Sequence, residues 1–409
     1  MTVIHLHKSQ PQEAAVVNLP GSKSESNRAL LINALCPQPG TIANLSPARD
    51  TAIMQKLLAQ KESDYNARDA GTVMRFMTAW LAIKGRPATI TGSPRMLERP
   101  IAPLVEALQQ LGANITYLGR KGFPPLQFNG FERQLTGHLH IDSSLSSQYI
   151  SALLMIAPLL PEGLTLHLTG TPVSMPYIDM TISLMQHFGV TVQHHHMTFT
   201  VPPQAYRYRP FTVEADWSAA SYWYALFALS DKQQMVLRGL KESSRQGDRV
   251  VAQMMQDFGV TSTWQGDDLI LGKKPAVLPH TQDFINCPDL AQTFAVLCAA
   301  WQQPCTFRGL QTLKIKETDR VAALHTELQK LGGSLEEKQD HWLLQPFKNG
   351  WQSIPTPTIA TYHDHRMAMA FAPLVSQRDI TIAEPDVVAK SYPGFWQDLR
   401  NCGIEIEQL

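Results

Sequence analysis

The sequence predicts a mixed α/β fold built from repeated units of about 70 residues. A helix end, a glycine and a short β-like run occur together five times, and the glycines are spaced 70 to 77 residues apart, at Gly112, Gly189, Gly259, Gly332 and Gly403. Glycine is favoured directly after a helix because the left-handed backbone there penalises a Cβ atom. Most of these glycines are followed by a strand, a polar turn and a second strand, as in 261–264 and 269–271, which is typical of a β-hairpin. The near-constant spacing therefore indicates a tandem αβ repeat.

The first repeat is expected to be abbreviated. Counting back from Gly112 places a cap near residue 40, but the candidate helix there, from Ser46 to about Gln60, has no glycine after it. It leads within ten residues to Asp69-Ala70-Gly71, where the next helix is expected to start. We therefore expect six repeats, three in each of two domains. The cleft between two such domains is the default place for a ligand.

Composition argues against several classes of protein. The chain has 409 residues, of which 44% are hydrophobic, with 35 basic and 35 acidic side chains. A protein that binds nucleic acid or a membrane surface is expected to carry a basic excess, so neither partner is predicted. No apolar run approaches the ~18 residues of a membrane-spanning helix, and the N-terminus alternates like a strand rather than resembling a signal peptide. The five cysteines lack Cys-x-x-Cys spacing, which suits a reducing compartment, so a cytoplasmic protein is expected.

The stretch Leu19–Leu31 has the features of an anion-binding helix start. A proline and a glycine interrupt the preceding segment, and a helix is expected to open at Ser24 or Glu25. The N–H groups and positive dipole end of a helix N-terminus favour anions, and Lys23 and Arg28 add two positive charges. An ordinary capped helix with surface charges explains the local pattern about equally well.

Two later loop-to-helix junctions have similar features. Asp69 is positioned as a helix N-cap, and Gly71 permits close approach of an anion to backbone N–H groups. Arg99 precedes a proline at another helix start, where its side chain is expected to project from the loop. Simple capping and a surface salt bridge are the alternatives at these junctions.

Neutral polar side chains gather at two further helix starts. One run holds more hydroxyl and amide donors than the single residue that capping needs: Ser143, Ser144, Ser146, Ser147 and Gln148. At the other, Ser174 and Tyr177 are placed to reach a ligand, although Tyr177 fits a place in the core equally well. The excess of donors suits a polyhydroxy or phosphorylated ligand.

The second half of the chain holds four charged motifs. Asp289 is positioned as a helix N-cap, and a carboxylate there also suits a general base. Residues 314–320 carry five charges before an amphipathic helix, a pattern also common on solvated surfaces. Residues 362–366, Tyr-His-Asp-His-Arg, lead into an apolar helix, and Lys390 precedes the last helix.

Histidines in this region raise the question of a metal. His363 and His365 are two residues apart, so on a strand they share a face. A zinc site needs a third ligand of suitable type and spacing, and none stands out, so no metal is predicted. The run His194–His196 lies in an expected hairpin turn and is interpreted as solvated surface.

Taken together, these motifs resemble the EPSP synthase family of enolpyruvyl transferases. The matching runs are Leu19–Leu31, Ala70–Arg75, Pro94–Leu108, Ser146–Pro158, Pro176–Asp179, Gln246–Asp248, Pro288–Asp289, Lys316–Arg320, Asp364–Met369 and Lys390. The resemblance implies a two-domain, inside-out α/β barrel built from six βαβαββ-type repeats. The chain is expected to cross between domains near residues 20 and 214, giving one domain of 1–19 plus 214–409 and an inserted domain of 20–213.

The resemblance also implies a reaction, the transfer of the enolpyruvyl group of phosphoenolpyruvate to the 5-hydroxyl of shikimate 3-phosphate. Both substrates are anions, so several converging cations are needed to offset their repulsion. By position, the residues expected on shikimate 3-phosphate are Lys23, Ser24, Arg28, Ser146, Ser147, Gln148, Ser174, Tyr177, Asp289, Thr312 and Lys316. Those expected on phosphoenolpyruvate are Lys23, Gly71, Arg99, Gln148, Arg320, Arg366 and Lys390. The inserted domain is expected to carry the shikimate 3-phosphate side, and the discontinuous domain the catalytic residues on the phosphoenolpyruvate side.

The resemblance assigns roles to four catalytic residues. Asp289 is expected to take the hydroxyl proton, and Glu317 to protonate the methylene carbon with assistance from Lys23 and His365. The resulting tetrahedral intermediate then expels phosphate. No metal, nucleotide or other cofactor is required, and closure of the domains around the first substrate is expected to complete the site. The expected partners are the two small-molecule substrates, and a monomer is expected.

Three positions depart from the family pattern. Asp69 stands where many relatives carry Asn, Phe76 where Pro is frequent, and Thr312 where some use Asn. Asp69 adds a negative charge beside an expected anion site, which leaves the affinities for phosphoenolpyruvate and for the herbicide glyphosate open.

Two alternative functions stay in view. The sister transferase that acts on UDP-N-acetylglucosamine uses a reactive cysteine in the first half, whereas this chain has none between Cys36 and Cys287. A non-catalytic anion-binding protein is the second alternative, and the presence of Asp289, Glu317 and Lys23 argues against it.

Overall fold

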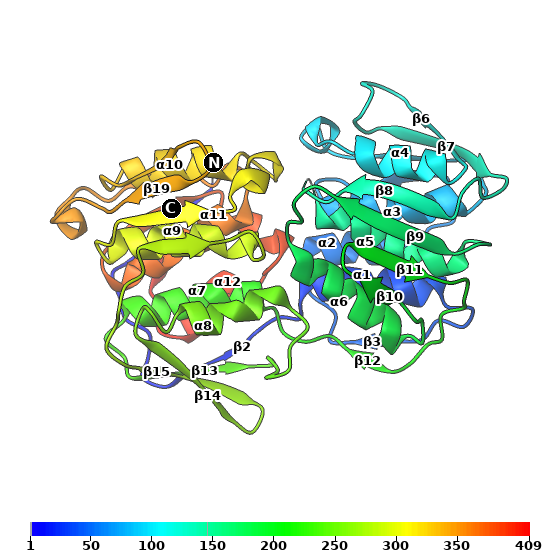
Figure 1. Cartoon of the computed structure of the whole chain (residues 1–409). Helices are drawn as coiled ribbons and strands as arrows, with labels where there is room; N and C mark the ends of the chain where they lie inside the picture. The colour runs from blue at the N-terminus through cyan, green and yellow to red at the C-terminus, as the bar shows by residue number, and fades with distance from the viewer. Residues whose placement is uncertain (1, 145) are drawn as a thin grey trace. The chain divides into compact units, whose positions relative to one another are not determined.

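The computed structural model describes residues 2–144 and 146–409, which form two compact units (Figure 1). Unit 1 comprises Met1–Ser22, Pro47–Arg49 and Glu214–Leu409, and unit 2 comprises Lys23–Ser46 and Asp50–Val213. Each unit has its own apolar core. None of the helices in residues 2–144 and 146–409 has the length and hydrophobicity to span a bilayer.

One topology recurs in the two four-stranded sheets that the described residues form in unit 2. In the first sheet, β4 (Asp64–Asn66) runs parallel to β5 (Ala88–Thr91), and the hairpin of β6 (Ala113–Tyr117) and β7 (Leu126–Phe131) adds to β5 through β7. Helices α3 (Gly71–Ile83) and α4 (Ala102–Gln110) follow the two parallel strands. The second sheet has the same order in β8 (His138–Asp142), β9 (Leu164–Thr169), β11 (Thr198–Val201) and β10 (Gln193–His195), with helices α5 (Ser147–Ile156) and α6 (Met175–His187).

Three sheets within the described part of unit 1 repeat this topology. The first contains β2 (Ala15–Asn18), β13 (Gln234–Arg238), β15 (Asp268–Lys273) and β14 (Val260–Gln265), with α7 (Trp217–Leu229) and α8 (Val251–Met254). The second contains β16 (Thr281–Asp283), β17 (Cys305–Arg308), β19 (Trp342–Gln345) and β18 (Ser334–Glu337), with α9 (Ala291–Ala300) and α10 (Arg320–Gln329). The third contains β20 (Thr358–Ile359), β21 (Ile380–Ala383), β1 (Val3–Leu6) and β22 (Ile406–Gln408), with α11 (His365–Phe371) and α12 (Phe395–Asn401). Strands from the two ends of the chain therefore complete the third sheet.

The remaining repeat is abbreviated, as the sequence predicted. Helix α1 (Lys23–Leu35), β3 (Ile42–Ala43) and α2 (Arg49–Ala59) follow one another, and β3 pairs in parallel with β12 (Phe211–Thr212). Among the described residues this sheet has two strands only, so it retains the parallel pair of the other repeats and lacks their hairpin. The prediction of six βαβαββ-type repeats, the first one shortened, is confirmed.

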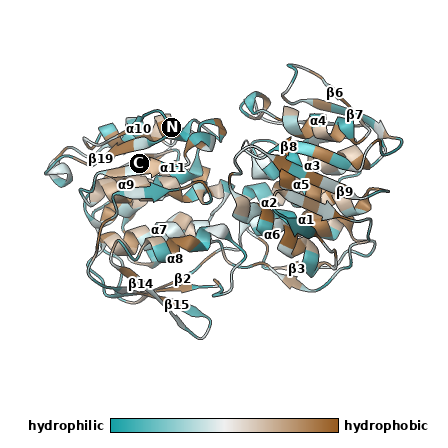
Figure 2. Ribbon diagram, in the orientation of Figure 1, coloured by the Kyte–Doolittle hydropathy of each residue, from teal (hydrophilic) through white to brown (hydrophobic). Residues whose placement is uncertain are grey.

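The first helix of a full repeat is buried over most of its length. Nine of the ten residues of α5 and twelve of the thirteen residues of α7 are buried. By contrast, β2 and β8 alternate between buried and exposed residues, as expected for a sheet with one solvated face. The helices therefore occupy the interior of each unit beneath the sheets, and Figure 2 shows apolar residues over much of α3 and α5. This is the expected inside-out arrangement, and it brings helix N-termini together within each unit.

The five glycines that defined the repeat all adopt positive φ angles, from 77° at Gly259 to 110° at Gly112. A Cβ atom at Gly112 would lie 2.2 Å from the carbonyl oxygen of Arg133, and one at Gly259 would lie 2.6 Å from that of Lys274. Backbone conformation and close packing thus both require glycine at these helix ends. The period in the sequence therefore arises because the same glycine-containing turn follows a helix in five repeats.

Candidate active site

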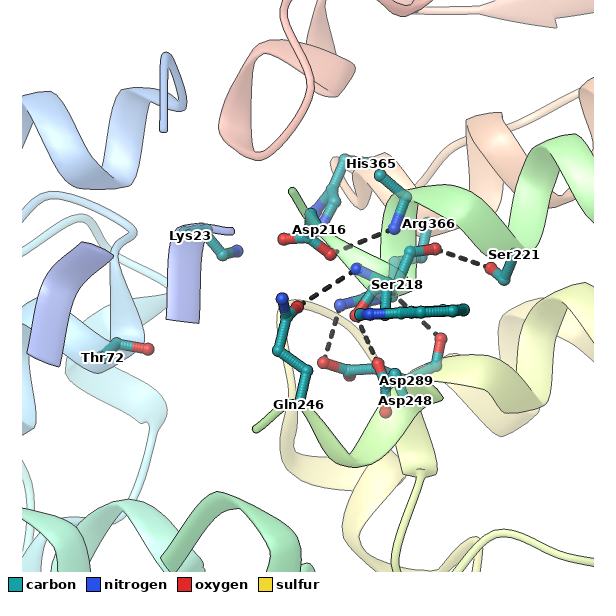
Figure 3. A network of polar contacts seen from close by, with 12 residues as sticks. Lys23, Thr72, Asp216, Ser218, Ser221, Gln246, Asp248, Asp289, His365 and Arg366 are labelled. Carbon is teal, nitrogen blue, oxygen red and sulfur yellow. Dashed lines mark hydrogen bonds and ion pairs between the residues drawn. The ribbon is translucent and has the colours of Figure 1, made fainter. Parts of the chain in front are cut away.

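Two arginines from separate repeats of unit 1 hold the carboxylate of Asp289. Arg320 Nη1 donates to Asp289 Oδ1 at 3.1 Å, and Arg366 Nη2 donates to Asp289 Oδ2 at 2.6 Å (Figure 3 shows the Arg366 bond). The sequence prediction that Asp289 is an N-cap is wrong. Cys287 occupies that position for the 3-10 helix η4 (Pro288–Leu290), and the side chain of Asp289 pairs with guanidinium groups instead.

The ion pairs continue from Arg320 into a larger charged cluster. Arg320 Nη2 donates to Glu317 at 3.0 Å and Arg320 Nε donates to Asp364 at 2.7 Å. Lys390 Nζ lies 3.8 Å from the other Glu317 oxygen, and Arg320 and Lys390 are both buried. We use the name charged cluster for these three cations and three carboxylates: Arg320, Arg366, Lys390, Asp289, Glu317 and Asp364. Their formal charges balance, which offsets the cost of removing these ionised groups from water.

Burial and carboxylates act in opposite directions on Arg320. Desolvation by itself lowers the pKa of this guanidinium, whereas the nearby carboxylates of Asp364, Glu317 and Asp289 raise it. The combined effect of the carboxylates on the pKa is larger than that of burial, so the pKa of Arg320 lies above its ordinary value and the side chain stays charged. A fixed positive charge of this kind suits the binding of an anion.

Tyr222 and His365 border the charged cluster. Arg366 Nη1 donates to the Tyr222 hydroxyl at 3.1 Å, and burial raises the pKa of that phenol to about 12. His365 is the first residue of α11 and is buried, with Nδ1 3.5 Å from Asp364 Oδ1. Asp364 also caps this helix, because its Oδ1 accepts from the Arg366 backbone N–H at 2.9 Å. The sequence analysis named His365 and missed Tyr222 and Asp364, although the capping position of Asp364 was a local signal.

A second carboxyl group lies buried near the start of α7. Ser218 Oγ donates to Asp248 Oδ2, and Gln246 Oε1 accepts from the Trp217 backbone N–H at 3.1 Å (Figure 3). Burial, and secondarily the charge of Asp289, raises the pKa of Asp248 to about 7. The run Gln246–Asp248 was part of the family resemblance, but no role was assigned to it from the sequence.

In unit 2, helix α3 begins at Gly71 against two arginines. A Cβ atom at Gly71 would lie 2.7 Å from Arg99 Nη1 and 3.0 Å from Arg75 Nη1. Arg75 donates to the Gly71 carbonyl at 3.1 Å and to the Pro100 carbonyl at 3.3 Å. The glycine therefore gives two cations access to a helix N-terminus, an arrangement that favours anions. Arg99 is 6% exposed, so the alternative weighed from the sequence, a salt-bridged arginine on the surface, is wrong. The N-cap assigned to Asp69 is also wrong, since Ala70 holds that position.

Helix α5 begins close to the same place. The Ser146 side chain caps α5 by accepting from the Gln148 backbone N–H at 3.3 Å, and Ser147 is buried. Gln148 Nε2 donates to Thr72 Oγ1 at 3.4 Å, and the hydroxyl of Tyr149 donates to the Pro100 carbonyl at 2.6 Å. The structure thus brings three of the predicted residues, Gly71, Arg99 and Gln148, to neighbouring helix starts.

Arg28 lies inside unit 2 among α1, α5 and α6. It donates to Thr181 Oγ1 at 2.7 Å, to the Ser24 carbonyl at 2.9 Å and to Ser151 Oγ at 3.3 Å. The Arg28 guanidinium carbon also lies 5.3 Å from the Phe76 ring centroid and 5.8 Å from that of Tyr177. Burial lowers the pKa of Arg28 to about 10, which still leaves it charged near neutral pH. Its contact with a substrate stays a prediction.

The other predicted residues occupy separate segments. Lys23 is the first residue of α1, and its Nζ lies 3.3 Å from the buried carboxylate of Asp50. Ser174, at the start of α6, has φ 58° and ψ 37°, a left-handed conformation that costs free energy outside glycine and is often found at functional sites. Thr312 lies in the 3-10 helix η5 (Gln311–Ile315), and Lys316 follows directly.

Comparisons with known proteins decide the family. The model of the family described as EPSP synthase (3-phosphoshikimate 1-carboxyvinyltransferase) matches residues 6–62 and 55–399. The chain belongs to the EPSP synthase family. It is 47% identical over 407 residues to a 3-phosphoshikimate 1-carboxyvinyltransferase of Bacteroides fragilis (strain YCH46), with 98% of each chain covered. It is 37% identical over 415 residues to the protein of that name from Histophilus somni (strain 2336), covering 93% of this chain and 95% of the relative.

The fold comparison agrees with this family. An EPSP synthase structure from Acinetobacter baumannii superposes with a TM-score of 0.79 at 19% identity, with 100% of both chains covered. The EPSP synthase family and its two-domain α/β fold, both inferred from the sequence motifs, are therefore confirmed.

Proposed function

We propose that this chain transfers the enolpyruvyl group of phosphoenolpyruvate to the 5-hydroxyl of shikimate 3-phosphate, producing 5-enolpyruvylshikimate 3-phosphate and phosphate. Full-length similarity to enzymes of that name supports the proposal. The structural observation that carries it is the carboxylate of Asp289 held between Arg320 and Arg366. A general base beside buried cations is what a reaction between a hydroxyl group and an anionic substrate requires.

Phosphoenolpyruvate is assigned to the cations of the charged cluster. Arg320, Arg366 and Lys390 are paired with carboxylates in the structure, so an anionic substrate binds by taking over part of these bonds. Arg99 and the α3 N-terminus at Gly71 are assigned to the same substrate, together with Gln148 and Lys23. Arginine suits this task because its planar fork of donors matches phosphate and carboxylate oxygens.

Shikimate 3-phosphate is assigned to polar side chains that lie mostly at helix starts. Ser146, Ser147 and Gln148 offer two hydroxyls and an amide at the start of α5, which suit a phosphate or a ring hydroxyl. The remaining proposed contacts are Lys23, Ser24, Arg28, Ser174, Tyr177, Asp289, Thr312 and Lys316.

The chemistry proceeds in two stages. In the first stage Asp289 accepts the proton of the 5-hydroxyl, and the oxygen of that hydroxyl bonds to C2 of phosphoenolpyruvate. The electrons of the C2–C3 double bond then take up a proton at C3. Glu317 supplies that proton, with Lys23 and His365 assisting. In the second stage the Glu317 carboxylate takes a proton from C3 and the C2–C3 double bond re-forms. The C2–O bond to phosphate breaks, and phosphate departs with the bonding electrons and the proton held by Asp289. Because Arg320 and Lys390 stabilise the ionised form of Glu317, its protonation requires the substrate to draw these cations away.

Release of inorganic phosphate tests the proposal. Phosphate is expected only when phosphoenolpyruvate and shikimate 3-phosphate are both present, with 5-enolpyruvylshikimate 3-phosphate formed in equal amount. Release that requires UDP-N-acetylglucosamine instead, or no release with either acceptor, overturns it. We further propose that the chain acts as a monomer in the cytoplasm, which sedimentation of the purified protein and fractionation of cells would check.

A further inference from the structure

Two histidines of the N-terminal strand meet acidic side chains on one face of a unit 1 sheet. Strand β1 lies between β21 and β22, and its Ile4 and Leu6 are buried. His5 and His7 alternate with these residues and therefore lie on the opposite, more solvated face. One nitrogen of each histidine and one carboxylate oxygen of Asp379 all lie within 4.8 Å of one another.

The spacing of these groups suits a shared cation. His5 Nε2 is 3.7 Å from Asp379 Oδ2, and His7 Nε2 is 3.3 Å from Oε2 of Glu407, which lies on β22. The two imidazole rings lie 4.4 Å apart, centroid to centroid. Two imidazole nitrogens and two carboxylate oxygens are a common ligand set for a borderline divalent metal such as Zn²⁺.

Two of these side chains, His5 and Asp379, are each oriented by a hydrogen bond to a group outside the set. His5 Nδ1 is 3.1 Å from Thr381 Oγ1, which leaves His5 Nε2 directed at Asp379. Asp379 Oδ1 accepts from the Lys8 backbone N–H at 2.6 Å, which leaves Oδ2 as the atom facing His5. Such outer contacts fix the orientation of ligand side chains in metal sites, and their loss typically weakens metal binding 10- to 100-fold.

We propose that His5, His7, Asp379 and Glu407 form a zinc-binding site distinct from the charged cluster. Coordination at about 2.0–2.2 Å requires the four atoms to draw closer, and the exposed side chains of His7, Asp379 and Glu407 are free to adjust their rotamers. The ion would join the first strand of the chain to the last strand and to the residue preceding β21. Its effect is stabilisation of unit 1, because binding to the folded form alone raises stability by mass action.

The primary test is calorimetric titration of the full chain with ZnCl₂ after removal of metals with EDTA. One equivalent is expected to bind, and His5→Ala and His7→Ala are each expected to weaken binding at least tenfold. The matched control is the double variant His194→Ala, His196→Ala, which removes exposed histidines of the β10–β11 hairpin in unit 2 and should leave this equivalent intact. Thermal unfolding of the unaltered chain should shift upward with zinc, and that shift should vanish in His5→Ala.

Thr381→Val is the sharper variant, because it keeps the side-chain volume and removes only the group that orients His5. A roughly tenfold weaker zinc affinity with unchanged unfolding temperature in EDTA supports the site. Glu407→Gln, at an exposed position, provides a second variant if His5→Ala fails to fold. Zinc binding that is equal in Thr381→Val, Glu407→Gln and the unaltered chain, or that is lost in the hairpin control, overturns the proposal.

Discussion

Arg366 contacts Asp289 through both of its terminal nitrogens. Nη2 donates to the Oδ2 carboxylate oxygen at 2.6 Å and Nη1 donates to the backbone carbonyl at 3.2 Å. Arg366 therefore stabilises the ionised carboxylate of Asp289, the proposed base, and also holds the backbone of this residue in place. A substrate anion beside Arg366 would compete with the Asp289 carboxylate for this guanidinium, which couples substrate binding to the basicity of Asp289.

Replacing Asp289 with Asn tests its role as the base. The amide keeps the size of the side chain and cannot accept the hydroxyl proton, so kcat for phosphate release is expected to fall about 10²- to 10⁴-fold. The exposed turn variant Asp267→Asn is the matched control and should keep its activity. A kcat within a factor of three of the unaltered enzyme would show that another group takes the proton.

Arg366→Lys keeps the positive charge and removes the fork of donors. Loss of one charge-assisted hydrogen bond costs ~1.5–3 kcal/mol, so KM for phosphoenolpyruvate is expected to rise roughly 10- to 150-fold. Steady-state kinetics at saturating shikimate 3-phosphate measures this change. Arg238→Lys alters an exposed arginine paired with Asp268 and should leave KM unchanged. An unaltered KM in Arg366→Lys would place phosphoenolpyruvate elsewhere.

Gly71→Ala introduces a methyl group into the space that Arg99 uses. The new atom would lie 2.7 Å from Arg99 Nη1 and 2.9 Å from Nη2, so the guanidinium must move. These are the ends of a flexible side chain, and the unfolding temperature is therefore expected to change little, whereas KM for phosphoenolpyruvate should rise about tenfold. Gly119→Ala is the control, since its nearest neighbour would lie at an ordinary 3.6 Å. Equal KM values in the two variants would remove Gly71 and Arg99 from the site.

Local sequence signals predicted where helices end, and they did so for a physical reason. Gly112 and Gly259 mark helix ends because only glycine fits the backbone there, and that requirement is contained in a few adjacent residues. The shortened first repeat could be predicted from the sequence for the same reason, because no glycine follows helix α2.

The partners of charged side chains were not predictable in this way. Asp289 was interpreted as a cap from its neighbours, but its carboxylate is held by Arg320, 31 residues further along the same repeat, and by Arg366 from the next repeat. Likewise, Arg99 precedes a helix and looks exposed in the sequence, yet it is buried against Gly71. Ion pairs between residues far apart in the sequence depend on how the elements pack in three dimensions. They therefore produce no repeating pattern in the sequence from which they could be predicted.

The buried carboxyl of Asp248 predicts a specific pH dependence of stability. Burial raises its pKa from 3.8 to about 7 in the folded protein, so between these values the folded state holds a proton that the unfolded state has lost. This contribution to stability is present below about pH 4 and is lost as the pH rises to about 7. Asp248→Asn cannot titrate, so its urea midpoint relative to that of the unaltered chain should be higher at pH 8 than at pH 5.

Ser218→Ala separates this explanation from a general effect of substitution. The Ser218 hydroxyl donates to Asp248, and this bond partly opposes the rise in pKa. Its removal should raise the pKa of Asp248 further, so the loss of stability is expected to extend to higher pH than in the unaltered chain. Urea unfolding at intervals between pH 4 and pH 9 measures both variants. A constant difference between Asp248→Asn and the unaltered chain across that range would mean that Asp248 is ionised in the folded protein throughout.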